Sequence, residues 1–261
     1  MIDFSVEDGV AVVAFNRPER LNALNPEMRQ ALGDHFEAIS VNDDIRAVVL
    51  TGRGGAFCSG ADVGAMGGAT GGGKAMTERR KGLQWGSHRA IRALYRIEKP
   101  TVAAVNGAAA GVGWGYALAC DVVIASPDAK FTFAQVRRGL APDGGSIFFL
   151  TRRVSHGVAR ELVFSARSLP AAEAKALGVI DHLSEESDAL LLAMTTARRL
   201  AEGPTFAIGQ CKRLFDASTS MGFDQFIELE LQVIGLLGST EDHREGVDAF
   251  KERRPARFKG R

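Results

Sequence analysis

One stretch, residues 102–121, constrains the fold most strongly, because an apolar run is followed at once by four glycines within nine residues. The run ends at Asn106, and small-residue helical spacing begins after Gly115. This order predicts a buried strand, a tight turn and a helix start. The first amides of a helix have no intrahelical partner, so such a turn can bind developing negative charge. Tight packing of a helix on a strand in a small-residue core is the alternative interpretation of this segment.

The composition indicates a globular chain with a sizeable core, since 46% of its 261 residues are apolar. This length fits one large domain, or a domain with an appendage. The net charge of +1, from 32 basic and 31 acidic residues, argues against a broad nucleic-acid-binding or membrane-binding face. Only the tail, 251–261, is basic enough to face phosphates.

The cysteines are too few and too widely spaced to form a disulfide framework or a metal-ligand pattern with the histidines. They are Cys58, Cys120 and Cys211. We therefore expect reduced core thiols and no metal site. The chain opens without a charged and then apolar leader, and no apolar run approaches about 18 residues. The expectation is a soluble cytoplasmic protein.

Predicted strands and helices alternate through the first two thirds of the chain, which is typical of a layered α/β fold. Asn25, Pro26 and Glu27 supply a cap, a first-turn proline and a first-turn acid for one helix. The predicted strands are 10–15, 47–51, 101–105, 122–125, 130–133 and 179–180, and the other predicted helices are 78–97, 113–120 and 169–177. From residue 187 onward only helical periods occur, with breaks at 203–204, 218–222 and 238–239. We therefore divide the chain into an α/β core, 1–186, and a helical region with a basic tail, 187–261.

A second informative turn, 56–63, follows the predicted strand 47–51 just as the first turn follows a later strand. If the two turns face each other, one amide from each can converge on a single oxygen and stabilise an oxyanion. A capped helix start, with Asp62 satisfying local amides, is the alternative.

Five sequence pieces resemble the crotonase superfamily, the enoyl-CoA hydratase/isomerase family. They are 17–24 (RPERLNAL), 57–62 (FCSGAD), 99–121, 139–146 (GLAPDGGS) and the tail 245–260. Each piece alone is weak, but in this order they span nearly the whole chain. The resemblance implies a spiral of ββα units that binds acyl-CoA, followed by a C-terminal helical trimerisation region, and a homotrimer or a dimer of trimers.

The resemblance also implies which residues hold an acyl-CoA thioester. The amides of Ala61 and Val112 would form an oxyanion hole for the thioester oxygen. The substrate-binding positions that it implies, Ala61 again among them, are Leu21, Ala23, Ser59, Ala61, Asp62, Val63, Ala108 and Gln135. Lys259 of the basic tail would approach the CoA phosphates, either in the same chain or on a neighbouring subunit.

Two departures from the family pattern bear on the reaction. Gly115 and Gln135 stand where a hydratase of this family carries its two glutamates, and neither side chain can titrate. Asp143 stands where several isomerases and a dehalogenase of the superfamily carry their acid. A turn or capping role is the other use of an aspartate in a Pro-Asp-Gly sequence.

These residues favour an enoyl-CoA isomerase that uses Asp143 to move a proton, with no metal or redox cofactor and with CoA as part of the substrate. The alternatives are a weak hydratase, a dehalogenase-like use of Asp143 as a nucleophile, and a catalytically silent acyl-CoA-binding subunit.

Overall fold

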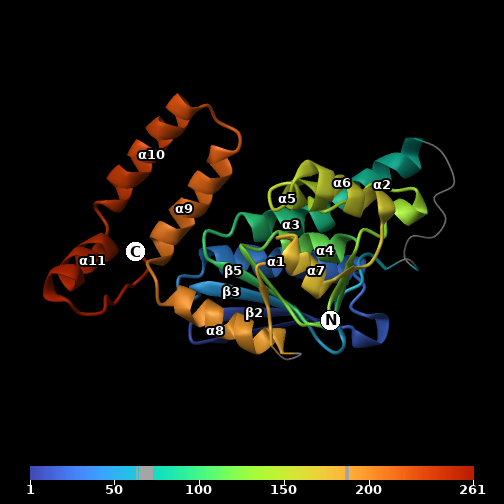
Figure 1. Ribbon diagram of the computed structural model, residues 1–261, viewed down its shortest axis with the longest axis horizontal. Coiled ribbons are helices and arrows are strands. Elements are labelled where there is room, and N and C mark those ends of the chain that lie inside the picture. The colour runs from blue at the N-terminus through green and yellow to red at the C-terminus, as the bar shows by residue number, and fades with distance from the viewer. Residues whose placement is uncertain (63, 65–72, 186–187) are drawn as a thin grey trace.

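Two sheets form the centre of the described part of the molecule, residues 1–62, 64, 73–185 and 188–261 of a computed structural model (Figure 1). The larger sheet has the order β1-β2-β3-β5-β7-β10, and the smaller has the order β4-β6-β8-β9. Their strands are β1 (Ile2–Glu7), β2 (Val10–Phe15), β3 (Ala47–Gly52), β4 (Ala56–Cys58), β5 (Thr101–Val105), β6 (Ala108–Ala110), β7 (Val122–Ala125), β8 (Lys130–Thr132), β9 (Leu169–Pro170) and β10 (His182–Leu183). Neighbours pair in parallel, except that β1 is antiparallel to β2 and β9 to β8. This mixed α/β architecture confirms the predicted fold class.

The central strands are apolar on both sides because helices cover both faces of the larger sheet. In β3, Val48 and Leu50 join the main core, while Ala47 and Val49 face the other way. That second face is covered by α8 (Ala189–Ala201), in which an alanine at every fourth residue faces the sheet and allows a close approach to it. This helix of the C-terminal region is therefore part of the packed α/β core.

The helices begin and end largely where their capping residues indicate. The Asn25 side chain accepts a 2.8 Å hydrogen bond from the Met28 amide at the start of α1, and Gly178 has a φ of 78° just after α7. The remaining helices are α1 (Pro26–Val41), α2 (Gly73–Trp85), α3 (Ser87–Tyr95), α4 (Val112–Leu118), α5 (Ser146–Leu150), α6 (His156–Ser165), α7 (Ala171–Ala176), α9 (Thr205–Ser218), α10 (Phe223–Leu237) and α11 (Glu241–Glu252), with 3₁₀ turns at Pro18–Arg20 and Val136–Arg138.

Four local predictions were wrong. The single helix predicted over 78–97 is two helices, because Gly86 adopts a non-helical backbone between α2 and α3. The predicted turn after Asn106 contains a short strand, β6, before α4 begins. Residues 179–180 form a bend, and the strand β10 starts at His182. Cys211 is exposed, whereas Cys58 and Cys120 are buried as expected. Helices α5 and α6 lie in a segment for which we predicted no element.

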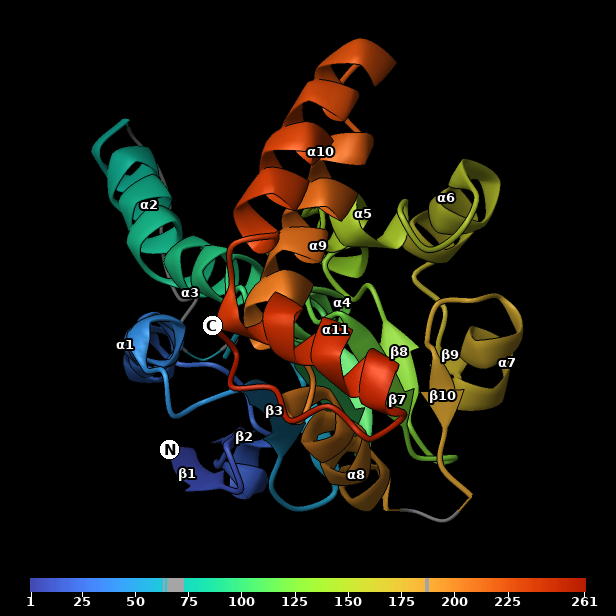
Figure 2. The same ribbon diagram turned by 90° about the vertical axis from the view of Figure 1, so that its left-hand side faces the viewer.

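An arm made of α9 and α10 leans away from the sheets, and α11 crosses beside its base (Figures 1 and 2). The chain then folds back along α11, where Asp242 accepts hydrogen bonds from the amides of Lys259 (2.7 Å) and Gly260 (2.8 Å). Arg46, just before β3, binds the carbonyl oxygen of Phe258 at 3.1 Å. No helix among the described residues is long and apolar enough to span a membrane.

Candidate active site

Two glycine turns meet at one edge of the smaller sheet. Strands β4 and β6 pair in parallel, so the turns that follow them, at Gly60 and Gly111, leave the same edge of the sheet. Both glycines have a positive φ, +98° and +56° respectively. A β-carbon at Gly60 would lie 2.8 Å from the Ala110 carbonyl oxygen, which shows how closely the two backbones approach. Glycine is required here for both the conformation and the contact.

The amides of Ala61 and Val112 are free at this edge. Leu24 donates to the Gly60 carbonyl (2.7 Å) and accepts from the Asp62 amide (3.0 Å), so the Ala61 amide points away from this bridge. Val112 is the first residue of α4, where an amide has no partner within the helix. Within the described ranges neither amide donates a hydrogen bond to the protein. Two free donors therefore lie on adjoining turns, the arrangement that an oxyanion requires.

The loop at 17–24 runs along the first of these turns. The Ser59 amide donates to the Leu21 carbonyl at 3.0 Å, and Arg17 donates to the Ala23 carbonyl at 3.2 Å. Arg17 also forms a 2.6 Å salt bridge with Asp62. Its hydrogen bond to Asp62 is the main reason that the pKa of this carboxyl is lowered. The charged Asp62 side chain thus connects the turn after β4 to the loop at 17–24.

Asp143 reaches the site from the turn before α5 and is half-buried. Its Oδ1 accepts a 3.0 Å hydrogen bond from the Gln135 side-chain amide. The backbone of the turn is fixed by Ser146, whose hydroxyl donates to the Asp143 carbonyl oxygen at 2.5 Å. A β-carbon at Gly144 would lie 2.7 Å from Val112 Cγ2, so this turn is packed directly on the start of α4. The structure therefore brings Asp143, Gln135 and Val112 together.

Gly115 is closed in by the Asp143 turn. A β-carbon at Gly115 would lie 2.8 Å from Ser146 Oγ and 3.0 Å from the Gly144 carbonyl oxygen. A backbone carbonyl that close cannot give way as a flexible side chain can. A glutamate at this position would therefore require the turn that carries Asp143 to move.

Two nearby groups are held in their neutral forms by the protein interior. Burial raises the pKa of the Cys58 thiol to about 12, and burial also raises the pKa of the Tyr116 phenol. A thiol with such a pKa is not a nucleophile at neutral pH. Among the described residues at this site, Asp62 is paired with Arg17, whereas the Asp143 carboxylate forms no salt bridge.

The other sequence-predicted substrate positions differ in their placement. Ala108 is exposed on β6 beside the two turns, and Leu21 is 56% exposed with a left-handed backbone. Lys259 lies on the tail after α11, where its amide donates to Asp242 and the carbonyl oxygen of the preceding Phe258 accepts from Arg46, just before β3. The Lys259 ammonium forms a 3.2 Å salt bridge with Glu241. Val63 lies outside the described residues.

The family model of enoyl-CoA hydratase/isomerase matches residues 5–261 of this chain. The chain belongs to this family. Among the relatives of this chain, a Rhodobacter capsulatus protein titled "Probable enoyl-CoA hydratase" is 39% identical over 100% of the chain and 98% of its own length. The 1,2-epoxyphenylacetyl-CoA isomerase of Escherichia coli is 35% identical over 98% of the chain and 97% of its own length.

Solved structures agree with this assignment. The crystal structure of enoyl-CoA hydratase from Bacillus anthracis has a TM-score of 0.92 and 26% identity, covering 100% of this chain and 99% of that one. The protein is therefore an enzyme of the enoyl-CoA hydratase/isomerase family with the crotonase fold, and an acyl-CoA thioester is the substrate expected for that family.

Sequence reasoning assigned no role to two residues that build the site. Asn22 is fully buried with a φ of 58°, and its side-chain amide donates to the carbonyls of Arg53 (2.9 Å) and Ala56 (2.7 Å). The preference of asparagine for a left-handed backbone was the available signal. Ser146 left no signal, because its contact with the Asp143 turn depends on packing.

Proposed function

We propose that the enzyme moves the double bond of a 3-enoyl-CoA to the 2-position. The thioester oxygen would lie between the amides of Ala61 and Val112. Removal of a proton next to the carbonyl produces an enolate, whose charge these two donors stabilise. Asp143 then returns the proton two carbons away, and the double bond becomes conjugated with the thioester.

The observation that carries this proposal is the pairing of one carboxylate with one neutral amide, Asp143 with Gln135, 3.0 Å apart. A 1,3-proton shift needs one group that takes a proton and gives it back. Asp62 is unsuited to that task because Arg17 holds its carboxylate at 2.6 Å. Gly115 provides no side chain, and its surroundings leave no room for one.

Hydration would need a second proton-handling group to activate water, and neutral Gln135 can only hydrogen-bond to it. A hydratase of weak activity is the second candidate function, since the Rhodobacter capsulatus relative bears a hydratase title. The name of the Escherichia coli relative, an epoxyphenylacetyl-CoA isomerase, favours acyl-CoA isomerisation in general.

The ratio of two kcat/KM values tests the proposal. We expect purified enzyme to isomerise 3-hexenoyl-CoA much faster than it hydrates crotonyl-CoA. Ultraviolet absorbance follows both reactions, because conjugation of the alkene with the thioester raises the signal and hydration removes it. Equal rates would contradict the isomerase assignment. Binding of acyl-CoA without turnover of either substrate would support a catalytically silent binding subunit.

We further propose that the CoA part of the substrate is held by backbone groups of Leu21, Ala23 and residues 59–63. Within one chain the Lys259 ammonium is paired with Glu241, and we propose that it reaches the CoA phosphates of a neighbouring subunit. Proton transfer alone accounts for the reaction, so neither a metal nor a redox cofactor is required.

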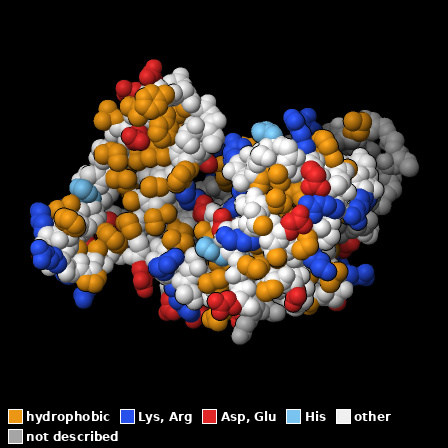
Figure 3. All heavy atoms as spheres, in the orientation of Figure 1, with side chains coloured by type: hydrophobic (Ala, Val, Ile, Leu, Met, Phe, Trp, Pro, Cys, Tyr) orange, Lys and Arg blue, Asp and Glu red, His pale blue; other side chains and the backbone are white. Residues whose placement is uncertain are grey.

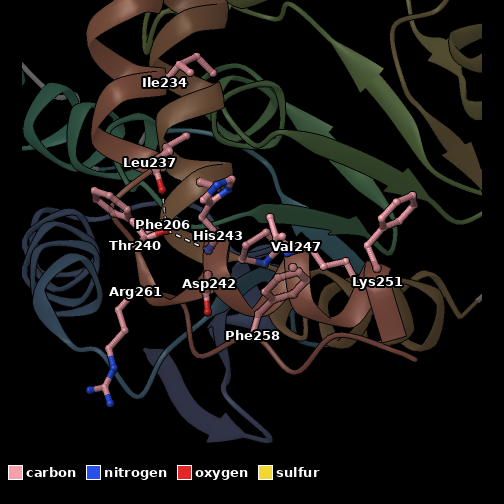
Figure 4. A pocket seen from close by; sticks show the side chains of 15 residues that line it. Phe206, Ile234, Leu237, Thr240, Asp242, His243, Val247, Lys251, Phe258 and Arg261 are labelled. Atoms are coloured by element: carbon pink, nitrogen blue, oxygen red, sulfur yellow. Dashed lines mark hydrogen bonds between the residues drawn. The ribbon is translucent and has the colours of Figure 1, made fainter. Parts of the chain in front are cut away.

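The assembly that we propose is a homotrimer, or a dimer of trimers, formed through the helical arm. Hydrophobic side chains cover much of the visible arm (Figure 3). An apolar groove of about 880 Å³ opens between α9, α10, α11 and the returning tail (Figure 4). Phe206, Ile234, Leu237, Val247 and Phe258 are among its lining residues. A second copy of the chain would cover such a surface.

A further inference from the structure

Asp143 is held in two ways, through its side chain and through its backbone. On the side chain, Gln135 Nε2 donates to Oδ1 at 3.0 Å. The other polar atom of that carboxamide, Gln135 Oε1, is buried and has no hydrogen-bond partner among the described residues. Within the described chain the carboxamide is therefore anchored through its hydrogen bond to Asp143 alone. The position of Asp143 thus depends on the contacts of its backbone.

One buried serine holds the backbone of this turn. Ser146 is 1% exposed, and both its hydroxyl (2.5 Å) and its amide (3.2 Å) donate to the carbonyl oxygen of Asp143. The two residues between them, Gly144 and Gly145, have positive φ values of 62° and 70°. Glycines populate many backbone conformations at little cost, so a turn that contains two of them needs outside contacts to stay in one. The hydrogen bonds of Ser146 select that conformation.

The Ser146 hydroxyl occupies a space that exists because residue 115 is glycine. A β-carbon at Gly115 would lie 2.8 Å from Ser146 Oγ and 3.0 Å from the carbonyl oxygen of Gly144. The first distance is too short for two atoms that are not bonded, so the hydroxyl would have to turn away. Its hydrogen bond to Asp143 would then be lost. A side chain at position 115 and the present position of this hydroxyl exclude each other.

The same turn packs on the start of the helix that supplies a proposed oxyanion donor. A β-carbon at Gly144 would lie 2.7 Å from Val112 Cγ2. Because Gly144 follows Asp143 directly, a shift of the turn changes the distance between the carboxylate and the Val112 amide. Both groups act on one enolate in the proposed reaction, so that distance must be fixed. A misplacement of about 1 Å can lower a rate by roughly 10²-fold.

We propose that Ser146 is a positioning residue for Asp143 and that Gly115 is the steric partner that leaves room for its hydroxyl. The proposal rests on the function proposed above and adds two residues that act through Asp143. Because a side chain at position 115 would displace this contact, the pair also commits this part of the site to a single carboxylate.

The test combines kinetics with crystal structures of Ser146→Ala and Gly115→Ala. We expect each variant to lower kcat by about 10- to 100-fold and to change KM by less than about twofold, because the carboxylate moves while the thioester-binding amides remain. The turn at 143–145 should be shifted relative to the start of α4. Both changes remove the same hydrogen bond, so the double variant should be at most about threefold slower than the slower single variant, whereas independent effects would multiply.

Thr51→Val is the matched control. Thr51 is also 1% exposed, and its hydroxyl donates to the carbonyl oxygen of Ala104 at 2.9 Å, between β3 and β5. Its loss should lower the Tm and leave both kcat and the turn unchanged. Ser146→Ala removes a single oxygen atom, so it decides the question even if Gly115→Ala does not fold.

An unchanged kcat in Ser146→Ala would overturn the proposal, as would a lower kcat with Asp143 in its wild-type position. The kinetic comparison uses the thioester that the wild-type enzyme turns over faster, 3-hexenoyl-CoA or crotonyl-CoA. Faster hydration by the wild type would refute the isomerase assignment alone. The crystal structures test the positioning without any turnover, since an unshifted turn in Ser146→Ala refutes it whatever the reaction.

Discussion

Asp143 and Gln135 form the contact on which the chemistry of the proposed site depends. One is a carboxylate and the other a neutral amide, and 3.0 Å separates the two side chains. The amide orients the carboxylate without competing for its proton. A single base held in this way is suited to moving a proton between two carbons.

Asp143→Asn is predicted to lower the isomerisation rate by about 10² to 10⁴, the usual contribution of one acid–base group. The asparagine preserves the size of the side chain, so folding and thioester binding should persist. Steady-state kinetics and a binding titration of the same preparation check both parts. Near wild-type turnover by the folded variant would place the base elsewhere.

Gln135→Glu is predicted to move the acid limb of the kcat/KM profile to higher pH, by at least about one pH unit. Two carboxylates in contact share a proton, and the pair keeps it to a higher pH than a lone carboxylate does. Since the base must be deprotonated, activity appears only at the higher pH. Gln135→Met, which adds no charge, should lower the rate and leave the limb in place. An unshifted profile for the glutamate variant would argue against contact between the two side chains.

Among the secondary-structure elements, the start of α4 matters most, because the end of β4 and the turn that carries Asp143 both pack against it. A β-carbon at Gly113 would lie 2.3 Å from the Cys58 carbonyl oxygen, so α4 packs directly on the end of β4. Glycines, and no larger residues, permit that approach. The same packing fixes the position of the Val112 amide, which has no partner within the helix because Val112 is the first residue of α4.

Val112→Pro should lower turnover by about 10² to 10³, since it removes one oxyanion donor. Proline is tolerated at the first position of a helix, which Val112 occupies, so α4 should still form. Val112→Ala retains the amide and serves as the control for the loss of the side chain. Thermal unfolding establishes that both variants are folded. A proline variant that is folded and fully active would disprove the role of this amide.

At the scale of the whole molecule, the arm presents more apolar surface than a monomer ordinarily exposes. On α10, Phe223 is 76% exposed, Leu231 66% and Ile234 61%. These side chains lie outside the two packed cores of the described chain. Covering them by self-association would also bring the tail of one subunit near another.

We predict that sedimentation at micromolar concentration shows a trimer or hexamer and that Leu231→Glu dissociates it, because a charge buried in an apolar interface is costly. Phe164→Glu, at a similarly exposed position on α6, should leave the assembly unchanged. If the wild-type protein sediments as a stable monomer, the proposed assembly is wrong.

The sequence by itself determined those helices and strands that depend on residues close together in the chain. Apolar runs identified strands such as β2 and β3, the Asn25-Pro26 pair marked the start of α1, and glycine and proline breaks separated the C-terminal helices. The ordered series of motifs also identified the family, because each motif keeps its own short spacing. Periodicity and capping depend on neighbours within a few residues, which a sequence displays directly.

Tertiary structure decided which of these local features share a site. Arg17 and Asp62 are 45 residues apart in the chain, yet their side chains form a hydrogen bond. Gly115 and Ser146 are 31 residues apart, yet a β-carbon at Gly115 would contact the Ser146 hydroxyl. The glycine turns after β4 and β6 likewise meet only because those two strands pair. Such contacts arise from the packing of whole helices and strands, and the cost of leaving a donor unpaired depends on burial, which only the folded chain defines.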